Sequence, residues 1–219
     1  MERKKREERA SGPRLKAALA GAVEWWEEHG RDFPWRNTVD PFRILVAELL
    51  LQRSRSGSVR SVYIELFERW PTPTDLKVAD TDSILAVIEP LGLQQRASRI
   101  KELASAWDDL DQVPTGVAGL QQLPGIGPYS AKATAAAMSW SAQPPVDSVS
   151  SRVMKRLLGG LSDGKDDDEL AISVYSHAPE GRWRDLNWAI LDIAAAVCMP
   201  KIPRCDDCPI SADCGWSNP

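Results

Sequence analysis

The stretch LQQLPGIGPYSAKATAAAM, residues 120–138, places two glycines between two segments of helical character. The pattern predicts a short helix, a turn at Leu-Pro-Gly-Ile-Gly, and a second helix that begins near Pro128. Gly125 and Gly127 allow positive φ and let the backbone approach a ligand closely. The amide groups at the start of the second helix form an anion site, and Lys132 adds a positive charge one turn later. The sequence therefore predicts a hairpin that holds a DNA phosphate without reading bases, with a plain helix–turn–helix corner as the alternative.

The rest of the chain also shows helical periodicity, and strand-like alternation is nearly absent. The 219 residues include 43% hydrophobic and 26% charged residues, which is typical of a globular protein of one large domain or two small ones. The predicted helices cover residues 15–29, 42–52, 58–70, 80–92, 94–110, 117–122, 128–140, 150–160, 168–178 and 182–198. We therefore expect an all-α protein with short connections.

Charge and hydropathy limit the classes of function. No apolar run approaches the length of a membrane span, and the start MERKKREERASGPR lacks the apolar core of a signal peptide. We expect a cytoplasmic protein with no membrane partner, associated with the nucleoid if the source is prokaryotic. The net charge is −4, but residues 121–160 hold four basic side chains and one acidic one, so a local basic face is compatible with the sequence. Residues 1–13 are expected to form a basic tail that is solvated and disordered.

Asp147 lies in PPVDSVSSRVMKRLLG, residues 144–159, between a Pro144–Pro145 turn and a predicted helix. An aspartate just before a helix is usually an N-cap. On these residues alone, the N-cap interpretation is favoured over a catalytic one.

All four cysteines lie within CMPKIPRCDDCPISADC, at Cys198, Cys205, Cys208 and Cys214. In an intracellular protein such thiols are metal ligands or free thiols more often than disulfides. The spacing Cys-x6-Cys-x2-Cys-x5-Cys contains one close pair, whereas structural zinc sites usually have two. Four thiolates hold either zinc or an iron–sulfur cluster, and the spacing alone leaves both open.

Three features occur in order: LPGIGPYSAKA at residues 123–133, PPVDSVSSRV at residues 144–153, and the four cysteines. Together they resemble the helix-hairpin-helix DNA glycosylases of the endonuclease III superfamily, whose 4Fe–4S cluster loop has a similar cysteine spacing. The segment FPWRNTVDPFRILVAELLLQRS, residues 33–54, resembles the opening helix of the monofunctional branch. The resemblance covers about residues 15–216.

The resemblance implies an all-α fold of two lobes with duplex DNA between them, in which the target base leaves the stack and enters a cleft. One six-helix lobe would carry the hairpin and span residues 41–147. The other lobe, with the iron–sulfur cluster, would join residues 14–40 to residues 148–219. The expected partner is double-stranded DNA with a mispaired or damaged base, and we expect a monomer.

Cutting an N-glycosidic bond produces an oxocarbenium-like sugar, so the reaction needs an acid for the departing base and a carboxylate near the sugar. By resemblance, Asp147 corresponds to the family aspartate that stabilises the sugar cation and orients water. Glu48 corresponds to the glutamate that acts at the base. Burial within LVAELLLQ would raise the pKa of such an acid toward that of a proton donor, unless Glu48 is paired with an arginine or a helix end.

Bifunctional members carry a Schiff-base lysine at the position of Tyr129, and a tyrosine cannot form an imine. The resemblance therefore implies a monofunctional glycosylase without strong lyase activity, with Tyr129 in the catalytic site. Lys132 is then expected to contact a phosphate. Arg53 corresponds to the wedge residue that fills the gap left by the flipped base, with its neighbour Gln52 also in contact with DNA. A plain phosphate contact is the alternative for Arg53.

Two branches of the family fit the sequence: glycosylases that remove T or U opposite G, and glycosylases that remove A opposite G or 8-oxoguanine. Three features favour the first branch. The chain ends directly after the cysteines, whereas adenine glycosylases usually append a further domain. LGLQQRASRIKEL, residues 91–103, lacks the paired tyrosines of the adenine branch. Arg53 stands where that branch tends to have glutamine.

Two residues depart from the thymine branch. Trp188, assigned to the base pocket, stands where the thymine branch tends to have leucine and the adenine branch glutamine. Val149 replaces an asparagine common to both. Another damaged or modified base is therefore an open alternative. A non-catalytic, lesion-sensing DNA-binding protein is a hypothesis of another class, and the presence of both Glu48 and Asp147 argues against it.

By the same resemblance, the four cysteines hold a 4Fe–4S cluster that takes no part in the glycosidic chemistry. The cluster is expected to fix the C-terminal loop. Lys201 and Arg204, between the first two cysteines, would then face DNA phosphates, with simple solvation as the alternative.

Overall fold

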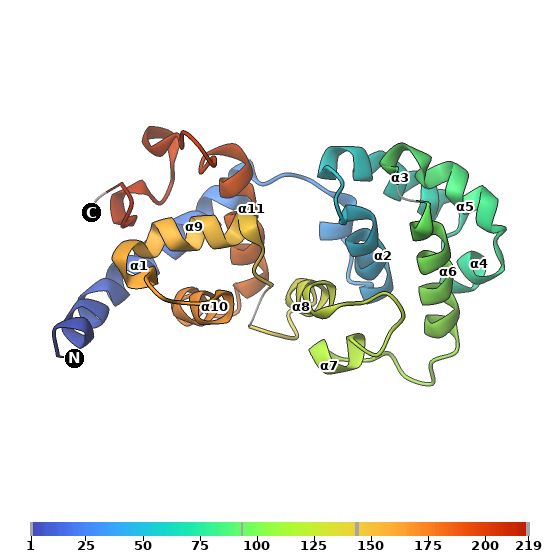
Figure 1. Cartoon of the computed structure of the whole chain (residues 1–219), viewed down its shortest axis with the longest axis horizontal. Helices are drawn as coiled ribbons and strands as arrows, with labels where there is room; N and C mark the ends of the chain where they lie inside the picture. Colours follow the sequence, from blue (N-terminus) through green and yellow to red (C-terminus); the bar gives the residue numbers. More distant parts are fainter. Residues whose placement is uncertain (1, 93, 143–144, 218–219) are drawn as a thin grey trace. The chain divides into compact units, whose positions relative to one another are not determined.

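The computed structural model describes residues 2–92, 94–142 and 145–217, and for residues 2–11 it describes the backbone alone. Every regular element in this part of the chain is helical, as the sequence predicts (Figure 1). The chain forms two compact units. One is Asp32–Ser141, and the other joins Met1–Arg31 to Ala142–Pro219.

The unit Asp32–Ser141 is built around α2 (Pro41–Leu51), whose apolar sequence predicts burial on nearly every side. Seven of its side chains are buried, and α2 contacts α3, α6 and α8. The remaining elements of the unit are η1 (Pro34–Arg36), α3 (Ser56–Arg69), α4 (Pro73–Val78), α5 (Thr81–Ile88), η2 (Glu89–Leu91), α6 (Gln95–Asp108), α7 (Gly116–Leu120) and α8 (Pro128–Ala137).

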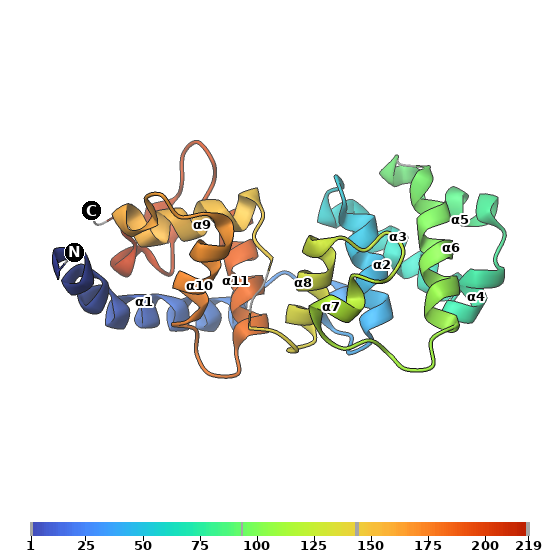
Figure 2. The same ribbon diagram turned by 60° about the horizontal axis from the view of Figure 1, so that its bottom comes forward.

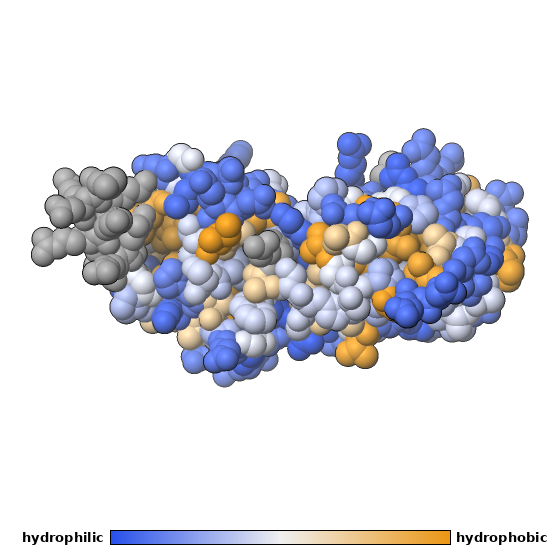
Figure 3. Space-filling view, turned by 90° about the horizontal axis from the view of Figure 1, so that it is seen from below, coloured by the Kyte–Doolittle hydropathy of each residue, from blue (hydrophilic) through white to orange (hydrophobic). Residues whose placement is uncertain are grey.

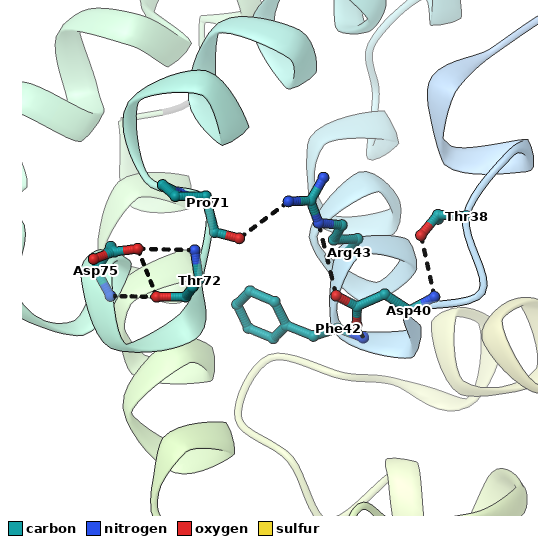
Figure 4. A network of polar contacts seen from close by, with 7 residues as sticks. All are labelled: Thr38, Asp40, Phe42, Arg43, Pro71, Thr72 and Asp75. Carbon is teal, nitrogen blue, oxygen red and sulfur yellow. Dashed lines mark hydrogen bonds and ion pairs between the residues drawn. The ribbon is translucent and has the colours of Figure 1, made fainter.

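Polar contacts fix where α2 and α4 begin (Figure 4). Asp40 accepts a hydrogen bond from the first turn of α2 at 2.9 Å, and Thr72 and Asp75 form a capping box at the start of α4. Arg43 of α2 donates to the carbonyl oxygen of Pro71 at 3.1 Å and lies 3.7 Å from Asp40. These contacts join the N-terminus of α2 to the start of α4. They fix the orientation of α2 and so the position of the residues at its C-terminal end.

The other unit contains α1 (Glu2–His29), α9 (Ser148–Leu158), α10 (Asp167–Tyr175) and α11 (Trp183–Ala196) (Figure 2). Its short 3-10 turns are η3 (Gly159–Ser162), η4 (Cys205–Asp207) and η5 (Ser211–Asp213). α11 is mostly buried and contacts both α1 and α9. Asp192 of α11 accepts hydrogen bonds from the backbone N–H and the guanidinium of Arg31 at 2.7–2.8 Å, which ties the segment after α1 to α11.

α1 begins at Glu2, so residues 2–13, which were expected to be disordered, are helical in the structure. The difference has a local cause. Glu, Lys, Arg and Ala fill all of residues 2–10, and all four residue types have high helix propensity.

Each unit has its own hydrophobic core. The core of Asp32–Ser141 includes Leu45 and Leu66, and the core of the other unit includes Met154 and Leu186. On the face shown in Figure 3, hydrophilic residues cover much of the surface, and hydrophobic residues form several small, separate patches. Among the described residues, none of the helices is long and apolar enough to cross a membrane.

Candidate active site

In the unit Asp32–Ser141, the two helices of the hairpin are joined by a type II turn from Leu123 to Ile126. The N–H of Ile126 donates to the carbonyl of Leu123 at 3.2 Å. Pro124 takes the second position of the turn, and Gly125 takes the third with φ +74°, which such a turn requires and which favours glycine. Leu123 and Ile126 are buried while Gly125 is exposed, so the turn is anchored to the core by its two ends.

The two helices that flank this turn are short. α8 begins at Pro128, as the sequence predicts, whereas α7 ends at Leu120 rather than at Gln122. It ends earlier because the N–H groups of Gln122 and Leu123 donate to the carbonyl oxygens of Gly119 and Leu120. These partners lie three residues back, whereas an α-helix requires four.

The start of α8 is exposed. Its N-cap, Gly127, has no side chain, and a Cβ built there would meet no atom within 4 Å. Pro128 and Tyr129 are also exposed, and Lys132 lies half-buried one turn later. The positive end of the α8 dipole thus lies at the surface, as an anion site requires.

Three further candidate residues lie together at the C-terminal end of α2. Glu48 is half-buried in the last turns of the helix, Gln52 follows one turn later, and Arg53 is exposed. Arg53 has φ +55°, which is uncommon for a residue other than glycine. The hairpin packs nearby, because a Cβ built at Gly125 would lie 3.7 Å from the side chain of Leu49.

Sequence reasoning did not single out Arg96, a side chain of α6 that is 2% exposed. Its guanidinium donates to oxygen atoms within residues 50–54, and burial, together with the charge of Arg99, lowers its pKa. A signal was available in the periodicity. Arg96 shares the buried face of α6 with Ile100 and Leu103, four and seven residues later.

In the other unit, Asp147 is the N-cap of α9. Its Oδ1 accepts hydrogen bonds from the backbone N–H of Val149 at 2.9 Å, from the N–H of Ser150 at 2.7 Å, and from the Ser150 hydroxyl at 2.9 Å. The Ser150 hydroxyl in turn accepts from the N–H of Asp147 at 2.9 Å, which completes a capping box. The box fixes the direction of the carboxylate. Of the expected Pro144–Pro145 turn, Pro144 lies outside the described residues.

Tyr175 of α10 is a neighbour of Asp147. Its hydroxyl donates to Oδ1 of Asn187 at 3.4 Å. Burial, with a smaller contribution from the charge of Asp147, raises the pKa of Tyr175 far above its ordinary value. This neighbour of the carboxylate is therefore a neutral phenol.

Trp188 is packed inside its unit. The side chain is 9% exposed, and its ring centre lies 5.6 Å from that of Trp26. The guanidinium carbon of Arg184, one turn earlier on α11, lies 5.3 Å from the centre of the Trp188 ring. The predicted role of Trp188 in a base pocket stays a prediction.

The structure describes all four cysteines, and they line one pocket together with apolar residues that include Val153, Ile193 and Ile210. None of the four forms a disulfide. Burial raises the pKa of Cys208 to about 11. Within the described residues, no group of three or more Cys, His, Asp or Glu side chains has the arrangement needed to hold a single metal ion.

The loop between the first two cysteines is held from α9. Arg156 donates to the carbonyl oxygens of Met199 at 2.7 Å and Pro200 at 2.9 Å. Lys201 follows and is exposed, while Arg204 donates to the carbonyl of Ala196. The structure thus fixes the loop that carries both predicted phosphate contacts, and those contacts stay predictions.

Residues 46–174 match the family described as HhH-GPD superfamily base excision DNA repair protein. The match covers more than half of the chain, and the chain belongs to this family. The resemblance drawn from the hairpin, Asp147 and the cysteines is confirmed.

Curated relatives extend the likeness over nearly the whole chain. The thymine-DNA glycosylase of Aeropyrum pernix is 33% identical over 94% of this chain and 96% of its own length. The thymine/uracil-DNA glycosylase of Methanothermobacter thermautotrophicus is 31% identical over the same shares. The adenine DNA glycosylase of Mycobacterium tuberculosis is 34% identical over 89% of this chain and 66% of its own length. These names agree with the predicted enzyme class, a DNA N-glycosylase.

Solved structures agree on the fold. A thermostable thymine-DNA glycosylase superposes with a TM-score of 0.84 at 30% identity, and the match covers 95% of this chain and 98% of that one. Endonuclease III in a non-covalent DNA complex superposes with a TM-score of 0.77 at 22% identity, over 94% and 96% of the two chains. At that lower identity the likeness shows the fold alone, and it confirms the all-α class.

Proposed function

We propose that this protein is a monofunctional DNA glycosylase of base excision repair that removes thymine or uracil mispaired with guanine and leaves an abasic site. The observation that carries the proposal is the Asp147 carboxylate, whose Oδ1 is fixed by three donors at the start of α9. A preorganised negative charge stabilises an oxocarbenium-like sugar. The likeness to the Aeropyrum pernix thymine-DNA glycosylase supports the choice of base.

In this proposal the target nucleotide rotates out of the duplex, and Arg53 and Gln52 contact the DNA at the gap. Glu48 donates a proton to the departing base. The electrons of the bond between the sugar and the base go to the base. A water oxygen then bonds to the sugar carbon, and the proton that this water loses passes to the Asp147 carboxylate. Asp147 stabilises the sugar cation and orients that water.

The hairpin holds the DNA without reading its sequence. Gly125 and Gly127 let a phosphate approach the start of α8, and Lys132 adds a positive charge nearby. Tyr129 lies at the same exposed helix start and has no amine. The proposed enzyme therefore forms no imine with the sugar and does not cut the strand by β-elimination.

We also propose that Cys198, Cys205, Cys208 and Cys214 hold a 4Fe–4S cluster. The donor set fits, because four thiols that form no disulfide line one pocket, and such clusters are held by four cysteine thiolates. When bound, the cluster supplies a cross-link between the end of α11 and the C-terminal loop. The test is elemental analysis with a visible absorption spectrum. Four irons per chain and a brown protein are expected, and one zinc per chain would contradict the proposal.

Removal of adenine opposite G or 8-oxoguanine is a second candidate function. The 34% identity to the Mycobacterium tuberculosis adenine DNA glycosylase favours it. Arg53, and the lack of paired tyrosines in residues 91–103, favour the thymine branch instead. Trp188 and Val149 depart from that branch, so a modified pyrimidine belongs in the test as well.

The experiment is a glycosylase assay with enzyme in excess over duplexes that contain T·G, U·G, A·G, A·8-oxoguanine or an oxidised pyrimidine. We expect T·G and U·G to react fastest, with strand breaks that appear only after alkali. Fastest reaction at A·8-oxoguanine would favour the second candidate. Tight binding to mispaired duplexes without base release from any of them would favour a non-catalytic DNA-binding protein.

A further inference from the structure

The loop after α2 is held by a buried cation from α6. The guanidinium of Arg96 donates to the carbonyl oxygen of Leu50 at 3.1 Å, to the hydroxyl of Ser54 at 2.9 Å, and to the carbonyl oxygen of Gln52. Ser54 closes the turn by donating its own N–H to the carbonyl of Leu51 at 3.0 Å. One side chain therefore hydrogen-bonds to residues on both sides of Arg53.

This cation is costly where it stands. Arg96 is 2% exposed, its Nε has no hydrogen-bond partner, and it forms no ion pair among the residues that the structure describes. A buried charge without a carboxylate partner destabilises a protein, and an apolar side chain would pack there at lower cost. What an arginine adds is a planar fork that reaches several oxygen atoms at once.

The loop it holds is itself strained. Arg53 has φ +55°, a left-handed conformation that L-residues other than glycine adopt with difficulty, and its side chain is exposed. Strain of this kind persists when surrounding contacts fix the backbone, and the three bonds from Arg96 are such contacts. The loop is thus preorganised in the folded protein, before any DNA is bound.

We propose that Arg96 is a positioning residue that holds residues 52–54 in the conformation that presents Arg53 to DNA. The inference rests on the proposed function, in which Arg53 fills the gap left by the flipped base. Because the loop is ordered in advance, insertion of Arg53 costs less conformational entropy, and base release is faster.

A double-mutant cycle of Arg96 and Arg53 tests this, with the single-turnover rate of base release from a T·G duplex as the readout. R96M should lower the rate by about tenfold in the wild-type background, equivalent to ~1.4 kcal/mol, and by less than about twofold in the R53A background. The matched control is R69M, which removes an exposed arginine of α3 that is paired with Glu65. An equal loss from R96M in both backgrounds would overturn the proposal, because Arg96 would then act through the fold in general.

Two milder variants keep the test decisive if R96M fails to fold. S54A removes one acceptor of the Arg96 fork and leaves the buried cation in place, so it should show the same dependence on Arg53 with a smaller loss. R96K keeps the charge but cannot reach several oxygens in one plane, and it should lose most of the rate. Full activity of R96K would overturn the proposal in favour of a purely electrostatic role.

Hydrogen exchange separates this inference from the proposed function. In the full chain without DNA, the backbone amide of residue 54 should exchange, relative to its intrinsic rate, at least about tenfold faster in S54A and R96K than in R69M, because the loop opens more often. If the wild type releases no base, the proposed function fails while this measurement still decides whether Arg96 orders the loop. Unchanged exchange in both variants would overturn the inference, whatever the enzyme's activity.

Discussion

Substitution of Asp147 should separate its role as N-cap of α9 from its role in base release. An asparagine retains an Oδ1 that accepts from the N–H groups of Val149 and Ser150 and from the Ser150 hydroxyl. Asn and Asp are equivalent N-caps, so D147N should change the free energy of unfolding by less than about 0.5 kcal/mol. D147A leaves these donors without their acceptor and should cost about 1–2 kcal/mol. In a protein of this size each kcal/mol lowers the melting temperature by about 2–4 °C.

The rates of base release should rank these variants differently from their stabilities. Both variants lack the negative charge, so both should lower the single-turnover rate by about 10²- to 10⁴-fold. S150A keeps the charge and removes one donor, so it should lower the rate by only about fivefold, the equivalent of one hydrogen bond of ~1 kcal/mol. Thermal unfolding and a single-turnover assay on a T·G duplex give the two quantities for each variant.

Two results would contradict these two roles of Asp147. If D147N releases base within a fewfold of the wild-type rate, the carboxylate is not catalytic, and Asp147 is a helix cap alone. If D147A is as stable as D147N, the capping box contributes nothing measurable, and the fixed direction of the carboxylate loses its physical basis.

Four further predictions concern exposed positions of Asp32–Ser141. G127A should keep its free energy of unfolding to within about 0.5 kcal/mol, since the added Cβ meets nothing within 4 Å. It should nevertheless bind duplex DNA several-fold more weakly in a fluorescence anisotropy titration, and unchanged binding would contradict a phosphate contact there. G125A should instead lose about 1–2 kcal/mol of stability because of φ +74°, and a neutral effect would contradict the turn. R53G should be about 1 kcal/mol more stable than R53A in urea denaturation, since both lack the long side chain and glycine adopts φ +55° without the strain that alanine meets there; equal stability would show that the backbone there is not strained. Y129K should form a DNA adduct that borohydride traps, which the wild type does not form, and the lack of an adduct would place Tyr129 outside the catalytic site.

The parts of the structure that the sequence predicts are those decided by residues that are close together in the sequence. Leu-Pro-Gly-Ile specifies a type II turn because proline supplies the φ of the second position and glycine the positive φ of the third. Asp147 before an apolar-periodic segment specifies an N-cap for the same kind of reason. The all-α class follows from periodicity summed over many segments, so errors of one or two residues, as at the end of α7, do not affect it.

The contacts that sequence reasoning missed join residues far apart in the chain. Arg96 binds Leu50 across 46 positions, and Arg156 binds Met199 across 43. The positive φ of Arg53 is also beyond local prediction, because arginine itself disfavours that conformation and the surrounding contacts must impose it. The contact between the Ser150 hydroxyl and Asp147 was easier to predict, since a serine three residues after an N-cap aspartate is a weaker form of the capping box.

We propose that this chain hydrolyses the bond between a mispaired pyrimidine and its sugar without cutting the strand. The most direct measurement is mass-spectrometric detection of free base after enzyme in excess reacts with a T·G duplex that carries isotope-labelled thymine. We expect one labelled thymine released per duplex, an equal number of alkali-labile sites, and intact strands before alkali. Bound duplex with no free thymine, or strand cleavage without alkali, would contradict it.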